Sequence, residues 1–186
     1  MFGGNRGGNK KGGAKSKKVI VYDPAQLADL LSKLSDQNTI KAAEKALKPF
    51  CNGSECIPRL LQQVSENPDN TSKLQAAILI KRNLTKHYST YPDEAKRAVK
   101  SQILQIIQTE EARNVASNIV GTVSTILALS VKDEVVADPW DELFNTVFQM
   151  ASSGDEVMCS RAYLLLQHVS FSRSLFLKLP LHLKSV

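Results

Sequence analysis

The chain has 186 residues, of which 42% are hydrophobic, 23% charged and 6% aromatic, a composition typical of one globular domain. No apolar run approaches the roughly 18 residues of a membrane span, so we expect no membrane partner, and the glycines lack the period of collagen. Three cysteines without a preceding signal peptide argue against a secreted disulfide scaffold and favour a reducing compartment.

The net charge of +6 comes from the N-terminal end of the chain. Residues 1–18 carry six basic side chains, no acidic one and six of the nine glycines, whereas the rest of the chain is neutral. Because glycine is costly to order and little here is apolar, we predict a disordered Gly/Lys-rich tail over residues 1–22. Through residues 1–18 such a tail would bind nucleic acid only weakly, by charge.

From residue 23 onward, apolar side chains recur with the spacing of amphipathic helices, and no stretch shows the sustained alternation of a strand. The stripe Leu27, Leu30, Leu31 and Leu34 is one example. The stripes predict eight helices, grouped by their connections into four pairs: 24–35 with 38–50, 55–66 with 71–88, 92–108 with 110–131, and 139–151 with 155–169.

Capping and turn residues agree with these helices. Asp23-Pro24 and Asp138-Pro139 each place a side-chain acceptor before a proline at the first helical position, and Tyr91-Pro92 is similar. The run of residues 67–70 reads as a turn. Gly121 alone among the glycines falls inside a predicted helix, which indicates close packing or a weak point there.

The offset between the third and fourth pairs is about 40 residues, which is the period of HEAT and armadillo arrays. Each pair is amphipathic and has to stack on a neighbour to bury its apolar stripe. We therefore predict an all-α fold over residues 23–170, a HEAT/armadillo-like α-solenoid of about four antiparallel helix pairs. A compact helical bundle is the alternative.

Residues that could carry chemistry are sparse. Cys51 and Cys56 have no further Cys or His pair nearby to complete a zinc site, so buried free thiols are the simpler interpretation. The three histidines are far apart, and no nucleophile motif is present. We expect a protein that is not an enzyme and that has no metal site and no cofactor.

Basic side chains gather on two of the predicted helices. Arg82 and Lys86 share a face of helix 71–88, and Lys96 and Lys100 share a face of helix 92–108. Such a face is either simply solvated or meets an acidic partner. In a solenoid, one row of helices lines the binding surface, which favours the second helix of each pair.

Residues 74–88, LQAAILIKRNLTKHY, resemble the second helix of the importin-β N-terminal domain, in which small residues precede an aliphatic-Lys-Asn motif and an aromatic residue. Residues 97–104, RAVKSQIL, resemble the Arg-x-x-Lys-x-x-aliphatic-Leu helix of that family. Residues 140–143, WDEL, are similar to its Trp-Pro-Glu-Leu motif, with Asp141 in the proline position. The resemblance covers about residues 25–170 and is nearest to importers of ribosomal proteins and histones.

The resemblance implies a nuclear transport receptor, or its N-terminal fragment, which binds the GTP form of Ran and helps to import protein cargo such as ribosomal proteins or histones. It also implies contact with Phe-Gly nucleoporins and a location in cytoplasm, nucleus and nuclear pore. By position, the candidate partner-binding residues are Lys81, Arg82, Asn83, Lys86 and Lys100. Arg82 stands between the Lys and Asn that are usually adjacent in the family.

Residues 171–186 form an acid-free, basic and apolar end with Pro180 in it, and they do not resemble a further repeat. We expect a truncated or misread end of a longer receptor; the alternative is a genuine short protein with an unusual tail. Two other function classes stay open. One is a Ran-independent HEAT scaffold or chaperone for basic proteins, and the other is an RNA-binding protein led by the tail.

Overall fold

The computed structural model describes residues 20–132 and 140–170. Within these ranges the chain forms α-helices joined by short connections, two of which contain a 3-10 turn. The helices are α1 (Pro24–Ser32), α2 (Ile40–Phe50), α3 (Cys56–Glu66), α4 (Asn70–His87), α5 (Asp93–Thr109), α6 (Arg113–Lys132), α7 (Asp141–Ala151) and α8 (Glu156–Ser170), and the 3-10 turns are η1 (Lys33–Ser35) and η2 (Tyr88–Thr90).

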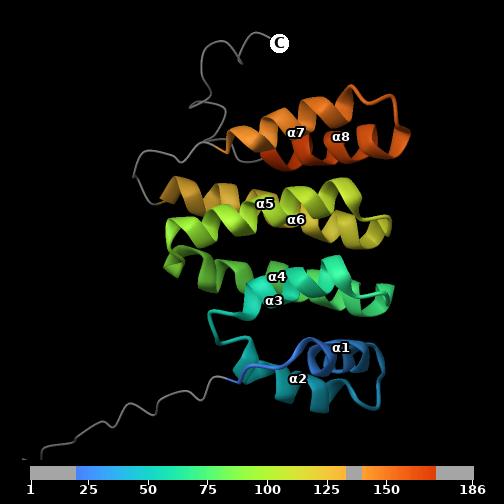
Figure 1. Ribbon diagram of the computed structural model, residues 1–186, viewed down its shortest axis with the longest axis vertical. Coiled ribbons are helices and arrows are strands. Elements are labelled where there is room, and N and C mark those ends of the chain that lie inside the picture. The colour runs from blue at the N-terminus through green and yellow to red at the C-terminus, as the bar shows by residue number, and fades with distance from the viewer. Residues whose placement is uncertain (1–19, 133–139, 171–186) are drawn as a thin grey trace, which may run out of the picture.

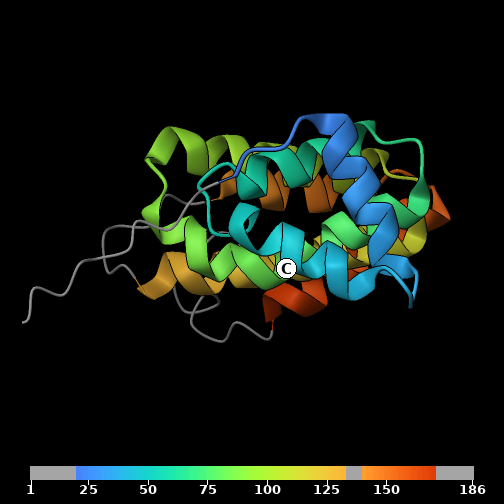
Figure 2. The ribbon, with the colours of Figure 1, turned by 90° about the horizontal axis from the view of Figure 1, so that it is seen from below.

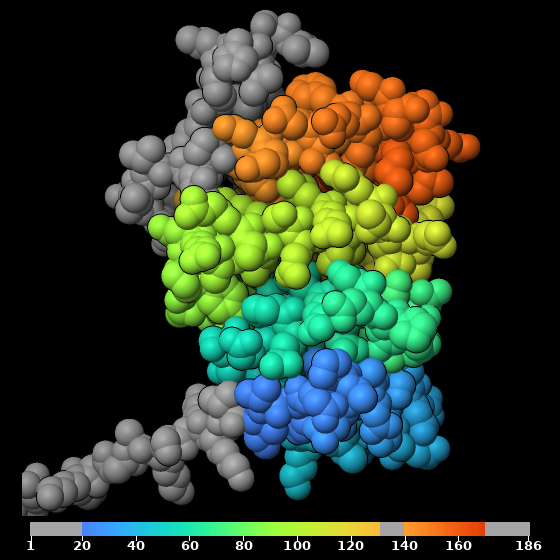
Figure 3. Space-filling model, viewed as in Figure 1, coloured from blue at the N-terminus to red at the C-terminus, as the bar shows by residue number. Residues whose placement is uncertain are grey.

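The helices stack as four successive pairs along the long axis of the molecule, from α1 and α2 at one end to α7 and α8 at the other (Figure 1). In the space-filling view the pairs follow one another as layers in contact (Figure 3). The first helices pack in the order α1, α3, α5 and α7, and the second helices α4, α6 and α8 form a parallel row. This arrangement confirms the predicted HEAT-like α-solenoid rather than a compact bundle.

The first pair departs from the regular stack. Helix α1 packs against α4 as well as against α2 and α3, and it crosses the helices behind it obliquely (Figure 2). Helix α2 has few contacts with α4, the second helix of the next pair. An open space between α2 and α4 therefore replaces the close packing seen farther along this row.

The helix boundaries follow the local sequence. The Asp23 side chain accepts a hydrogen bond from Gln26 N at 2.8 Å, and Pro24 begins α1, as predicted. At α5 the prediction was shifted by one residue: Pro92 itself is the N-cap, so Asp93 and Glu94 fill the first turn. Gly154 has a φ of +73° in the α7–α8 connection, a conformation that favours glycine. The predicted cap Asp138-Pro139 lies outside the described residues.

The predicted apolar stripes make one continuous core. Leu31 of α1, Leu61 of α3 and Leu84 of α4 are completely buried, and so are Ile103 of α5 and Ile119 of α6. Each such side chain contributes about 1.5–3 kcal/mol when it leaves water. Since every pair buries its stripe against a neighbour, the core runs through the stack rather than within single pairs.

Charged side chains join the later pairs. Lys73 of α4 forms an ion pair with Glu110, next to the end of α5, at 2.9 Å, and Glu110 is only 7% exposed. Arg161 of α8 is also buried; its Nη1 donates to the Ile107 carbonyl at 2.8 Å and its Nη2 to the Glu110 carbonyl. Arg161 thereby donates hydrogen bonds to carbonyl groups at the C-terminal end of α5, where no following helical turn provides N–H donors.

Most of the two predicted terminal segments lies outside the residues that the structure describes. Residues 1–19 and 171–186 are not among the described residues, so the Gly/Lys-rich tail and the basic-apolar end stay predictions. Tyr22, assigned to the tail from sequence, is half-buried: its hydroxyl donates to Ala46 O at 3.0 Å and its ring lies 6.0 Å from that of Phe50. This end of the segment is attached to α2. Across the described part of the chain, none of the helices combines the length and hydropathy that crossing a membrane requires.

Candidate functional site

Helix α4 carries four of the five candidate partner-binding residues. It begins at the N-cap Asp69, whose carboxylate accepts hydrogen bonds from Ser72 N at 2.9 Å and Thr71 N at 3.2 Å. The Ser72 hydroxyl also donates to Asp69, and these bonds lower the pKa of that carboxyl. Packing against α1, α3 and α6 then fixes the orientation of the whole helix.

The four α4 residues divide between two directions. Lys81 is exposed and lies across Gly121 of α6, because a Cβ at Gly121 would come within 3.2 Å of Lys81 Nζ. The close approach expected at Gly121 is therefore present. Arg82 and Asn83 face the opposite way and line the space between α2 and α4.

Lys86, one turn later, reaches the α2–α3 connection. Its Nζ donates to Cys51 O at 3.2 Å and to the side-chain oxygen of Asn52. Next to it, His87 Nε2 lies 2.9 Å from the same Cys51 carbonyl. Lys86 remains exposed while making these contacts. It is thus held in one place but can still be reached by a partner.

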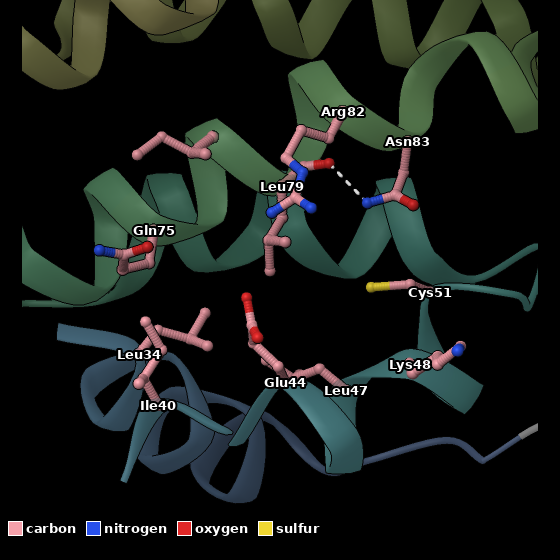
Figure 4. Close-up of a pocket in the computed structure, with 11 residues that line it drawn as sticks. Leu34, Ile40, Glu44, Leu47, Lys48, Cys51, Gln75, Leu79, Arg82 and Asn83 are labelled. Atoms are coloured by element: carbon pink, nitrogen blue, oxygen red, sulfur yellow. Dashed lines mark hydrogen bonds between the residues drawn. The ribbon is translucent and has the colours of Figure 1, made fainter. Parts of the chain in front are cut away.

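The space between α2 and α4 is a groove of about 600 Å³. In the close-up, Arg82, Leu79 and Asn83 descend from α4 while Glu44 and Leu47 rise from α2 (Figure 4). Leu34, Ile40 and Ile78 add to the apolar part of the wall. The Asn83 side chain donates to Leu79 O at 2.9 Å, so its amide is fixed against its own helix.

Charges of both signs line this groove. Glu44 and Lys48 are exposed on α2, and Arg82 is exposed on α4. The mixture of an apolar wall with a few charged groups suits a segment of protein rather than a small apolar ligand.

Lys100 lies elsewhere. It is 6% exposed on α5, and its Nζ stands 5.6 Å from the ring centroid of Trp140, a cation–π contact. Lys96, which shares a face with it in the sequence pattern, forms an ion pair with Asp93 at 3.6 Å. The prediction that Lys100 belongs to an exposed basic face of helix 92–108 is therefore wrong. The structure does not place Lys100 on the surface that α4 presents.

Side chains that could bind a metal ion are not gathered anywhere in the described ranges. No group of three or more His, Cys, Asp or Glu residues is placed there to share an ion. What the described surface offers is a row of second helices with cations on α4 and a groove beside them.

Comparison with known families identifies the segment that contains this helix. Residues 43–109 match the model of the importin-beta N-terminal domain. This segment is therefore similar to an importin-beta N-terminal domain. It extends from the middle of α2 to the last residue of α5 and includes all five candidate residues. No curated protein and no solved structure matches the chain closely enough to add a further comparison.

Two residues of this segment were not candidates from sequence. Glu44 and Cys51 line the groove, but an exposed Glu on a helix and a cysteine at a helix end are common without any function. Only the separation of α2 from α4 brings them opposite Arg82 and Asn83. No periodicity in the sequence reports that separation.

Proposed function

We propose that this chain is the N-terminal part of a nuclear transport receptor and that it binds the GTP form of Ran through α4. Lys81, Arg82 and Lys86 would provide the charged contacts, with Asn83 beside them. The match of residues 43–109 to the importin-beta N-terminal domain carries this proposal.

The chemistry of α4 supports this choice of surface. The helix has no acidic side chain, and three of its cations (Lys81, Arg82 and Lys86) are exposed. Exposed cations that stay hydrated in the free protein contribute most to the rate and specificity of binding when a partner offers opposite charge. Lys86 is already fixed by Cys51 O and Asn52, which reduces the side-chain entropy lost on binding.

The wider role follows from the same assignment. We propose that the receptor takes part in importing protein cargo such as ribosomal proteins or histones, that it contacts Phe-Gly nucleoporins, and that it moves between cytoplasm and nucleus through the nuclear pore. It would act by binding alone and not as an enzyme. Residues 1–18 would add only weak, salt-sensitive contact with nucleic acid.

The test is binding of the purified chain to Ran loaded with a non-hydrolysable GTP analogue or with GDP. We expect clear preference for the GTP form. The double variant Lys81→Glu/Lys86→Glu should lose about tenfold or more in affinity, because two attractive contacts become repulsive. Calorimetry or surface-based binding measures the affinity, and circular dichroism confirms that the variant stays helical.

The matched control reverses two exposed cations in the row of first helices, Lys33 at the end of α1 and Arg97 of α5. Lys33→Glu/Arg97→Glu changes the net charge equally and should leave Ran affinity almost unchanged. Equal binding of both nucleotide forms by a folded sample would contradict the proposal and favour a Ran-independent scaffold. RNA binding that falls steeply with salt and disappears when residues 1–18 are deleted would instead favour the RNA-binding class.

A further inference from the structure

Two cysteines flank the connection between α2 and α3. Cys51 is the C-cap of α2, and Cys56 is the first residue of α3. The four residues between them make a tight turn, in which Gly53 N donates to Phe50 O at 2.9 Å and Cys56 N donates to Gly53 O at 3.2 Å. The turn therefore holds the two cysteines at the facing ends of α2 and α3, with four residues between them.

The two thiols differ in their access to solvent. Cys51 is half-buried, and its sulfur points into the α2–α4 groove (Figure 4). Cys56 has no exposed surface and lies in the core behind it. A small oxidant in the groove can reach the first sulfur, whereas the second is reached only through its neighbour.

The surroundings of the two thiols also shift their pKa values in opposite directions. Interaction with the Cys56 thiol, together with the cations Lys86 and Arg82, lowers the pKa of Cys51. The same interaction, with burial, raises the pKa of Cys56 well above its usual range. Cys51 is thus the nucleophile of the pair, and Cys56 is the group held protonated beside it.

Side chains from α4 and the residue Tyr91 hold the α2–α3 connection in place. Lys86 and His87 of α4 both contact the Cys51 carbonyl, and the Tyr91 hydroxyl donates to Ser54 O at 2.6 Å. Glu44 and Lys48 are the other charged groups on the groove wall near Cys51. These contacts hold both thiols in place, which favours reaction within the pair over reaction with a second molecule.

We propose that Cys51 and Cys56 form a reversible oxidation site that reacts with hydroperoxides. The Cys51 thiolate attacks a peroxide oxygen and becomes a sulfenic acid, while hydroxide or alkoxide leaves and takes up a proton. The Cys56 thiol then loses its proton and attacks the Cys51 sulfur, which forms the disulfide and releases water. Dithiols reverse the reaction by thiol–disulfide exchange.

Cys159 of α8 provides an internal comparison. It is also half-buried, but its thiol donates to Met150 O at 3.7 Å and to Ala151 O at 3.5 Å, and no second cysteine is nearby in the described part of the chain. Without a neighbouring thiol, an oxidised Cys159 has no partner for a disulfide within the molecule. The proposal predicts selective oxidation at residues 51 and 56.

The experiment uses the full chain and reads mass, so its outcome is independent of Ran binding. The reduced protein is treated with hydrogen peroxide, remaining thiols are alkylated, and the digest is weighed. Trypsin releases residues 46–59, which contain both cysteines, since Lys48 precedes proline. We expect this peptide to lose two hydrogens and both alkylation sites, and cleavage after Glu55 to leave two fragments joined by the disulfide. Dithiothreitol should restore both thiols.

Variants separate the two steps. Cys56→Ala should leave Cys51 as a sulfenic acid that dimedone traps, and Cys51→Ser should leave Cys56 reduced. Cys159→Ser, the control, should form the disulfide at the unchanged rate. In the untreated protein, iodoacetamide should alkylate Cys51 several-fold faster than Cys159.

Three results would overturn the proposal. They are peroxide oxidation of Cys159 at the same rate as Cys51, oxidation of Cys51 to sulfinic acid while Cys56 stays free, and disulfides found only between molecules. If Cys56→Ala fails to fold, the wild-type peptide mass and Cys51→Ser still decide the question.

Discussion

The junctions between neighbouring second helices differ along this molecule. Between α2 and α4 the junction is open, and the charged side chains Glu44 and Arg82 stand in a groove. Where α4, α6 and α8 follow one another the helices pack closely, and Arg161 is buried with its guanidinium bonded to the end of α5. The same kind of amphipathic pair thus produces both a packed joint and a solvated recess.

The difference shows how the energetic cost of a charged side chain depends on its burial. A buried cation is tolerated only when its donors are bonded, so Arg161 is part of the support of the stack. An exposed cation such as Arg82 keeps its water, costs little and stays available for a partner. Removing charges at the two junctions should therefore have very different effects on folding.

The largest effect is expected for Arg161→Ala. The substitution removes bonds to Ile107 O and Glu110 O and leaves both carbonyls at a buried helix end, which should lower the free energy of unfolding by about 3 kcal/mol. Urea denaturation followed by circular dichroism measures the change. Arg161→Lys should recover part of it, and an unchanged midpoint for Arg161→Ala would show that the closed junction does not depend on this side chain.

A smaller effect of opposite sign is expected for Gly121→Ala. Alanine stabilises a helix interior by up to about 1 kcal/mol relative to glycine, and the nearest obstacle is the flexible end of Lys81 at 3.2 Å. Thermal unfolding should show a higher midpoint. The reverse substitution at an exposed site of the same helix, Ala128→Gly, should lower it by a similar amount. A destabilised Gly121→Ala would mean that Lys81 cannot move aside.

The smallest effects belong to the open junction. Arg82→Ala and Glu44→Ala each remove an exposed charge from the groove and should change the free energy of unfolding by no more than about 0.5 kcal/mol. The same urea titration as for Arg161→Ala makes the comparison direct. A loss near that of Arg161→Ala in either variant would show that the groove is closed in solution.

The sequence predicted the local structure of this protein well. Periodic apolar residues located each helix to within a few positions, and Asp23-Pro24 marked the start of α1. The candidate site was predicted less completely. Lys81, Arg82 and Lys86 are exposed on α4 as the helical pattern requires. The same pattern suggested an exposed Lys100, but the ring of Trp140, the residue that precedes α7, covers its ammonium group. A pattern within one helix cannot report a ring supplied by another.

By itself the sequence determined which residues are helical, which face of each helix is apolar, and that the pairs have to stack, because these properties depend on spacings of three and four residues. Only the tertiary structure decided that α2 stands apart from α4, that Arg161 reaches the end of α5, and that Lys86 reaches the Cys51 carbonyl. These features depend on how side chains from distant segments fit together at each junction, and many sequences with the same apolar pattern fit differently.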